Sequence, residues 1–150
     1  MTREEFIEQL DKEGYSYEME GDKLVVTHRG SVYLRSLQIL PPGVEFTNGG
    51  NVDLNSLKTL PPGVEFKNGG DVDLDSLKTL PPGVEFKNGG YVDLRSLKTI
   101  PPGVEFRNEG DVYLRALIGG WFEEWKGNIK GVDNKRLLNL MIKQGVFIWK

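Results

Sequence analysis

The hydrophobic positions in the middle of this chain recur every 20 residues. The motif Leu-Pro-Pro-Gly-Val-Glu-Phe begins at Leu40 and returns three more times, the last copy beginning at Ile100. Within each copy two short segments alternate apolar and charged residues, for example Val64-Glu-Phe-Lys and Val72-Asp-Leu-Asp. A period of two is typical of a β-strand with one buried face. Each repeat is therefore expected to contribute two short strands.

Prolines and glycines mark the ends of these segments. All eight prolines lie in the Pro-Pro pairs of the motif, and because proline fixes φ and lacks a backbone donor, each pair predicts a corner. Asn-Gly-Gly, as at Asn68, separates the two strands and predicts a turn, because these residues tolerate positive φ. Stacked copies would bury columns of Val, Phe and Leu side chains. The pattern predicts a mainly β fold, a short β-solenoid of about five 20-residue coils.

Tandem β-hairpins are the alternative architecture, and the sequence leaves it open. Asn-Gly between two alternating segments is also a strong hairpin signal. However, a hairpin would place Glu65 directly opposite Asp73, a like-charge pair that most copies would repeat. A solenoid instead stacks each glutamate on its counterpart, beside a column of basic residues. The solenoid is therefore favoured.

The repeats are expected to need a cap at each end, because terminal coils expose unpaired edges and apolar columns. In the N-terminal segment, Thr2 and Glu5 form a capping-box pair that predicts a helix, and Gly14 is placed to end it. The alternation from Tyr15 to Met19 predicts a strand. In the C-terminal segment, Asp133 is a good N-cap for a second helix.

These signals divide one predicted domain, residues 1–150, into three parts. They are an N-terminal α-helical cap at 1–20, a repeat array at 21–118 and a C-terminal α-helical cap at 119–150.

Composition and charge narrow the class of protein. The net charge of -3 argues against a nucleic-acid partner, which usually binds a basic surface. No apolar run approaches the ~20 residues that span a bilayer, and the first residues do not resemble a signal peptide. There are no cysteines, so disulfides and thiolate metal sites are excluded. We expect a cytoplasmic protein with no membrane partner.

Catalytic chemistry is not expected. The single histidine, His28, occupies the place that asparagine holds in later repeats, which indicates a turn residue. No nucleophile has a visible base partner, and no phosphate-binding loop occurs. The run from Asp71 to Asp75 resembles a calcium loop but lacks the glycine and glutamate that an EF-hand requires. We predict no cofactor and no metal, with a cation between stacked aspartates as the weaker alternative to a solvated acidic face.

The near-identical repeats differ mainly at the outward positions of their second strand. Asp71 and Asp75, for example, become Tyr91 and Arg95 one repeat later. Because side chains alternate across a strand, these positions should share one surface. Tyrosine and arginine are enriched at the energetic centres of protein interfaces. We therefore predict a binding face formed by Tyr33, Arg35, Asp53, Asp71, Asp73, Asp75, Tyr91, Asp93, Arg95, Asp111, Tyr113 and Arg115.

Two resemblances bear on this prediction. The run Leu-Asp-Ser-Leu-Lys-Thr-Leu-Pro-Pro-Gly-Val, from Leu74 to Val84, resembles the leucine-rich repeats of bacterial effectors. The whole chain is similar to a group of uncharacterised phage and environmental-sequence proteins. They share Leu-Pro-Pro-Gly-Val-Glu-Phe repeats and an ending like Trp125-Lys-Gly-Asn-Ile and Lys135-Arg-Leu-Leu-Asn. The second resemblance implies no established activity.

Taken together, the sequence predicts a non-enzymatic module that binds another protein. If the phage resemblance is informative, the partner is a host or defence protein. Two alternatives stay open. One is a small-ligand binder, such as a nucleotide-sequestering protein, with a pocket near Trp121 and Trp125. The other is a structural element that forms homo-oligomers through its cap edges.

Overall fold

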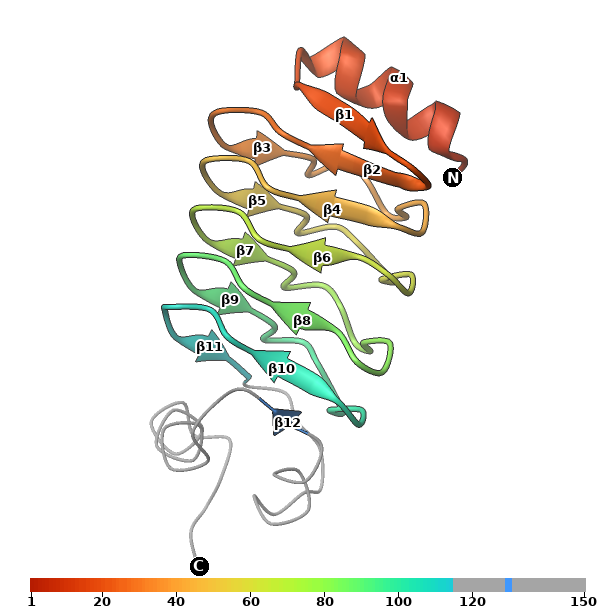
Figure 1. Ribbon diagram of the computed structural model, residues 1–150. Helices are drawn as coiled ribbons and strands as arrows, with labels where there is room; N and C mark the ends of the chain where they lie inside the picture. Colours follow the sequence, from red (N-terminus) through yellow and green to blue (C-terminus); the bar gives the residue numbers. More distant parts are fainter. Residues whose placement is uncertain (115–128, 131–150) are drawn as a thin grey trace, which may run out of the picture.

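The chain forms an N-terminal helix followed by a β-solenoid (Figure 1). The computed structural model describes residues 1–114 and 129–130. Its elements are α1 (Arg3–Glu13), β1 (Tyr17–Glu20), β2 (Lys23–Val26), β3 (Val32–Tyr33), β4 (Val44–Phe46), β5 (Val52–Asp53), β6 (Glu65–Phe66), β7 (Val72–Asp73), β8 (Glu85–Phe86), β9 (Val92–Asp93), β10 (Val104–Phe106), β11 (Val112–Tyr113) and β12 (Ile129–Lys130).

The strands form two sheets that run along the solenoid (Figure 1). Sheet A has the order β1-β2-β4-β6-β8-β10-β12, and sheet B has the order β11-β9-β7-β5-β3. Strands from successive repeats pair in parallel with equivalent residues side by side, so Asp73 lies between Asp53 and Asp93. This pairing confirms the predicted β-solenoid and excludes tandem hairpins, in which Asp73 would face Glu65. From β2 to β10 the chain completes about four turns, where the sequence predicted about five coils.

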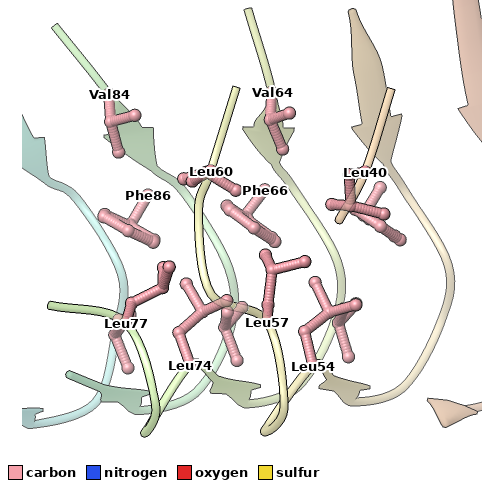
Figure 2. Packing of buried hydrophobic residues seen from close by; sticks show 14 of the residues in the cluster. Leu40, Leu54, Leu57, Leu60, Val64, Phe66, Leu74, Leu77, Val84 and Phe86 are labelled. Atoms are coloured by element: carbon pink, nitrogen blue, oxygen red, sulfur yellow. The ribbon is translucent and has the colours of Figure 1, made fainter. Parts of the chain in front are cut away.

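The interior consists of the predicted hydrophobic columns. Phe46, Phe66, Phe86 and Phe106 stack along the axis, with ring centroids 5.4 Å apart and planes within 3° between the first two. Figure 2 shows Phe66 and Phe86 together with leucines of neighbouring coils, such as Leu57 and Leu77, all buried in one core. Each coil is too thin to enclose its own apolar side chains. Burial therefore comes from the neighbouring coils, as in other repeat proteins.

The glycines of the Asn-Gly-Gly turns, although they tolerate positive φ, do not adopt it in the described residues. Positive φ occurs instead at the glycine after each Pro-Pro pair, with 75° at Gly43 and 81° at Gly63. The glycines of Asn-Gly-Gly are required for a different reason, the close approach of neighbouring coils. A Cβ atom on Gly69 would lie 2.5 Å from the carbonyl oxygen of Gly49.

A ladder of buried asparagines supports these turns. It consists of Asn48, Asn68, Asn88 and Asn108. The Nδ2 of Asn68 donates hydrogen bonds to the carbonyl oxygens of Gly50, Gly70 and Asp71, at 3.0 to 3.3 Å. Each asparagine therefore closes the turn of its own coil and binds the coil before it. This satisfies carbonyl groups that the turn would otherwise bury without partners.

The N-terminal cap forms as predicted. Thr2 Oγ1 accepts a hydrogen bond from the backbone of Glu5, whose side chain accepts one in return, and α1 ends at Gly14 with φ of 77°. Phe6 and Leu10 are fully buried in the solenoid core. The helix therefore covers the apolar columns of the first coil. The predicted strand forms as β1, which pairs antiparallel with β2.

Most of the predicted C-terminal cap lies outside the described residues, including Trp121, Trp125 and the helix expected after Asp133. Its described part, β12, pairs in parallel with β10. Sheet A therefore continues by one strand beyond the repeat array. In the part of the chain that is described, no helix is long and apolar enough to cross a membrane.

Candidate functional site

The predicted binding face lies on the outer side of sheet B. Its central column consists of residues that pair directly in the sheet, namely Tyr33, Asp53, Asp73, Asp93 and Tyr113. Parallel strands lie about 4.8 Å apart, so three carboxylates occupy adjacent rungs with a tyrosine at each end. Like charges at this spacing repel one another unless cations or hydrogen bonds compensate them.

Local hydrogen bonds explain why aspartate recurs in this column. Asp53 Oδ1 accepts a bond from the backbone N–H of Asn55 at 3.2 Å. Asp73 and Asp93 accept the equivalent bond from residues 75 and 95. A carboxylate that accepts from the backbone two positions later stabilises a turn. These aspartates therefore help to end the strands of sheet B, and this structural role is independent of any role in binding.

Two of the three aspartates are covered by arginine. Arg35 Nε donates to Asp53 Oδ2 at 2.6 Å. Arg95 donates hydrogen bonds to Asp93. Its Nε lies 3.0 Å from both carboxylate oxygens, and its Nη2 lies 2.6 Å from Oδ2. Only 7% of Asp53 and 3% of Asp93 is exposed. The sequence interpretation of a solvated acidic face is wrong at these two positions, because the arginines fold over the carboxylates and exclude water.

Asp73 has no such cation among the described residues. The position that provides Arg95 in the next coil holds Asp75 here. The pKa of Asp73 is raised to about 6, first by burial and then by the negative charge of Asp75, with smaller contributions from Asp53 and Asp93. The pKa of Asp75 is also raised, mainly by burial. The middle of the column therefore carries negative charge that the described part of the chain leaves unbalanced.

A hollow of about 260 Å³ lies beside this charge. Asn51 and Val52 belong to its wall although the predicted face omitted them. Asn51 directly precedes β5 at a position that varies between repeats, which was the available signal. Burial, followed by the nearby aspartates, raises the pKa of Tyr91, so its hydroxyl stays protonated and can donate. The lining residues are Tyr33, Arg35, Asn51, Val52, Asp53, Asp71, Asp73 and Tyr91.

The other predicted residues have mixed roles. Asp71 Oδ1 accepts a hydrogen bond from the backbone N–H of Tyr91 at 2.9 Å, so it also connects two coils. Tyr91 packs edge-on against Tyr113, with ring centroids 5.5 Å apart. Asp111 is exposed at the last described coil. Arg115 lies outside the described residues.

The part of the chain that is described offers one group of carboxylates with metal-binding spacing, formed by Asp73, Asp75 and Asp93. One oxygen of each lies within 4.8 Å of the others. Such oxygens suit calcium or magnesium, but Asp93 is already bound in bidentate fashion by Arg95. Arg95 holds both oxygens of Asp93, with Nε on Oδ1 and Nη2 on Oδ2. A metal would have to displace that arginine, so the geometry does not by itself assign a metal site.

The single histidine belongs to the first coil and packs against the N-terminal cap. The ring of His28 lies edge-on to Tyr15, with centroids 5.0 Å apart, and His28 Nδ1 accepts a bond from the backbone of Ser16 at 3.4 Å. These contacts fit the predicted structural role.

No protein-family profile matches the chain, and neither a curated protein nor a solved structure is significantly similar to it. The resemblances to phage proteins and to leucine-rich repeats therefore stay predictions.

Proposed function

We propose that this protein is a non-enzymatic interaction module that binds another protein through the outer face of sheet B. The observation that carries the proposal is the concentration of differences between near-identical coils on this one face. There they build a hollow with tyrosines on its wall and unbalanced negative charge beside it. Tyrosine and arginine supply large contact area and hydrogen bonds at protein interfaces.

The outer face of sheet A provides the contrast. Its glutamate column is neutralised internally, since Lys67 Nζ lies 3.0 Å from Glu45 and 3.2 Å from Glu65. Lys87 pairs with Glu85 at 3.0 Å in the next coil. Exposed pairs of this kind contribute little each, but they remove the like-charge repulsion of a stacked column. The outward glutamates of sheet A therefore have a structural reason to stay the same from repeat to repeat. No such structural reason explains why the outward residues of sheet B differ between repeats.

A small-ligand function has less support. Ligand pockets in proteins usually enclose about 300–1,000 Å³, and this hollow holds about 260 Å³. Its aspartates would also repel the phosphates of a nucleotide. A protein partner fits a shallow charged face better. If the phage resemblance holds, that partner is a host or defence protein, and a cytoplasmic location follows as part of the same proposal.

Affinity capture with the full chain tests this function. The test variant replaces Tyr33, Tyr91 and Tyr113 with serine. A matched control replaces three exposed lysines on another side of the solenoid, Lys58, Lys78 and Lys98, with serine. The proposal expects a partner that the wild type and the lysine control retain and the tyrosine variant loses. Equal capture by all three folded proteins would contradict it.

A further inference from the structure

Two neighbouring repeats of this chain act as a natural comparison. Residues 60–79 and 80–99 are identical except at two positions. Asp71 and Asp75 of the first repeat are replaced by Tyr91 and Arg95 in the second. Differences between the surroundings of Asp73 and Asp93 therefore trace largely to these two substitutions and to the adjacent coils.

The second repeat demonstrates how a guanidinium group binds an aspartate of this column. Arg95 approaches Asp93 with two nitrogens, and the ion pair leaves 3% of Asp93 exposed. The backbone bond from residue 95 to Asp93 Oδ1 holds the carboxylate in place. Asp73 has the same backbone bond from Asp75 at the same 3.2 Å. The receiving carboxylate is therefore fixed in the first repeat as well, without the cation.

The groups around Asp73 leave it short of positive charge. Asp53 and Asp93 lie on either side of it in the sheet, and Asp75 follows two residues later. The two nearby arginines are already committed, Arg35 to Asp53 and Arg95 to Asp93. Asp71 and Tyr91 contribute a further carboxylate and a protonated phenol to the adjoining hollow. Among the described residues, carboxylates outnumber guanidinium groups at this point of the face.

We propose that this face binds an arginine side chain presented by a protein partner, with its guanidinium group on Asp73 as that of Arg95 is on Asp93. This inference rests on the proposed function and names the chemistry of the partner. A planar guanidinium can donate two parallel bonds to a carboxylate, which the single ammonium of lysine cannot match. The wall of the hollow also suits it, since Arg35 already lies 5.1 Å from the centroid of the Tyr33 ring.

A peptide titration of the full-length chain tests the inference. The probe is acetyl-Gly-Arg-Gly-amide, and the matched control carries citrulline, which has nearly the same shape but no charge. Binding is followed by the backbone amide NMR signals of residues 73–75 and 91. We expect the arginine peptide to shift these signals and the citrulline peptide to bind at least about tenfold more weakly.

The variant Asp75→Arg gives the sharpest comparison. It makes the first repeat resemble the second, in which the chain already accommodates arginine, so the protein is expected to fold. Its new guanidinium should occupy Asp73 and weaken binding of the arginine peptide at least about tenfold. Asp73→Asn should do the same by removing the charge. Unchanged affinity in Asp75→Arg, or equal binding of citrulline, would overturn the inference.

Two further outcomes would also decide against it. No shift at about 10 mM arginine peptide would contradict a specific arginine site. If calcium chloride moves the same signals and the peptide does not, the carboxylates hold a cation instead. Capture experiments separate this inference from the proposed function. If the tyrosine variant loses a partner that Asp75→Arg keeps, the proposed binding face is supported. The inference that the partner presents an arginine to Asp73 is then contradicted.

Discussion

The hydroxyl group of Tyr15 binds both backbone groups of Tyr33. It accepts a hydrogen bond from the Tyr33 N–H at 3.0 Å and donates one to the Tyr33 carbonyl oxygen at 3.4 Å. Tyr33 belongs to β3, the first strand of sheet B, whose outer edge pairs with no other strand in the described part of the chain. One phenol therefore replaces part of the missing neighbour. This protects an edge that could otherwise pair with another chain.

Removing this hydroxyl should loosen the N-terminal end of the solenoid. We expect Tyr15→Phe to lower the free energy of unfolding by about 1 kcal/mol, because two backbone groups lose their partner while water can partly replace it. Tyr33→Phe is the control. Tyr33 is 48% exposed, so removal of its hydroxyl group should leave the free energy of unfolding nearly unchanged. Urea unfolding followed by circular dichroism measures both. A loss in the control as large as in Tyr15→Phe would contradict the edge-capping role.

The solenoid could be predicted from the sequence because its interior is periodic. Val, Phe and Leu return at the same places in each repeat, and a parallel stack is the arrangement that buries all of them at once. The N-terminal helix was predictable for a local reason. The capping pair Thr2 and Glu5 and the terminal glycine Gly14 act within a few residues of one another.

The surroundings of the site could not be predicted to the same depth. That the variable residues share one face follows from strand alternation alone. The burial of Asp53 and Asp93 depends on side-chain conformations of arginines that lie 18 residues away in one case and two in the other. The asparagine ladder was interpreted as turn chemistry, because its bonds to the preceding coil depend on the distance between coils. Sequence spacing does not give that distance.

The asparagine ladder should be intolerant of charge. Asn68 is 1% exposed, and its Nδ2 faces three carbonyl oxygens. Asn68→Asp would replace that donor with a carboxylate and should cost about 2–4 kcal/mol of stability at neutral pH. The stability lost by this variant should be smaller in acid, because the carboxyl group of the new aspartate becomes protonated and can donate one hydrogen bond. Denaturant unfolding near pH 7 and pH 4 tests this; a cost below 1 kcal/mol at both would contradict the ladder.

Close packing of coils should make one glycine column sensitive to size. A Cβ atom on Gly90 would lie 2.9 Å from backbone atoms of Gly70 and Asp71, although its φ is ordinary. Gly90→Ala should therefore destabilise the protein by about 1–3 kcal/mol, as overpacking does. Gly30 is the control in the same column, because its nearest contacts are 3.9 Å away on the His28 side chain. Thermal unfolding should show little change for Gly30→Ala, and equal losses would contradict the packing argument.

The unbalanced charge at Asp73 should make stability depend on pH. Its folded pKa of about 6 lies above the value of 3.8 expected without the fold, so the folded state binds the proton more tightly. The contribution of Asp73 to the free energy of unfolding should therefore rise as pH falls from about 7 to about 4. Asp73→Asn keeps an acceptor for the Asp75 backbone bond and removes the charge. We expect it to be about 1 kcal/mol more stable than the wild type near pH 7.5, a figure reduced for solvent screening of a half-buried group. The advantage should vanish near pH 4. Asp111→Asn, at an exposed position, serves as the control. A difference in stability between Asp73→Asn and the wild type that stays constant across this pH range would contradict the assignment of the unbalanced charge to Asp73.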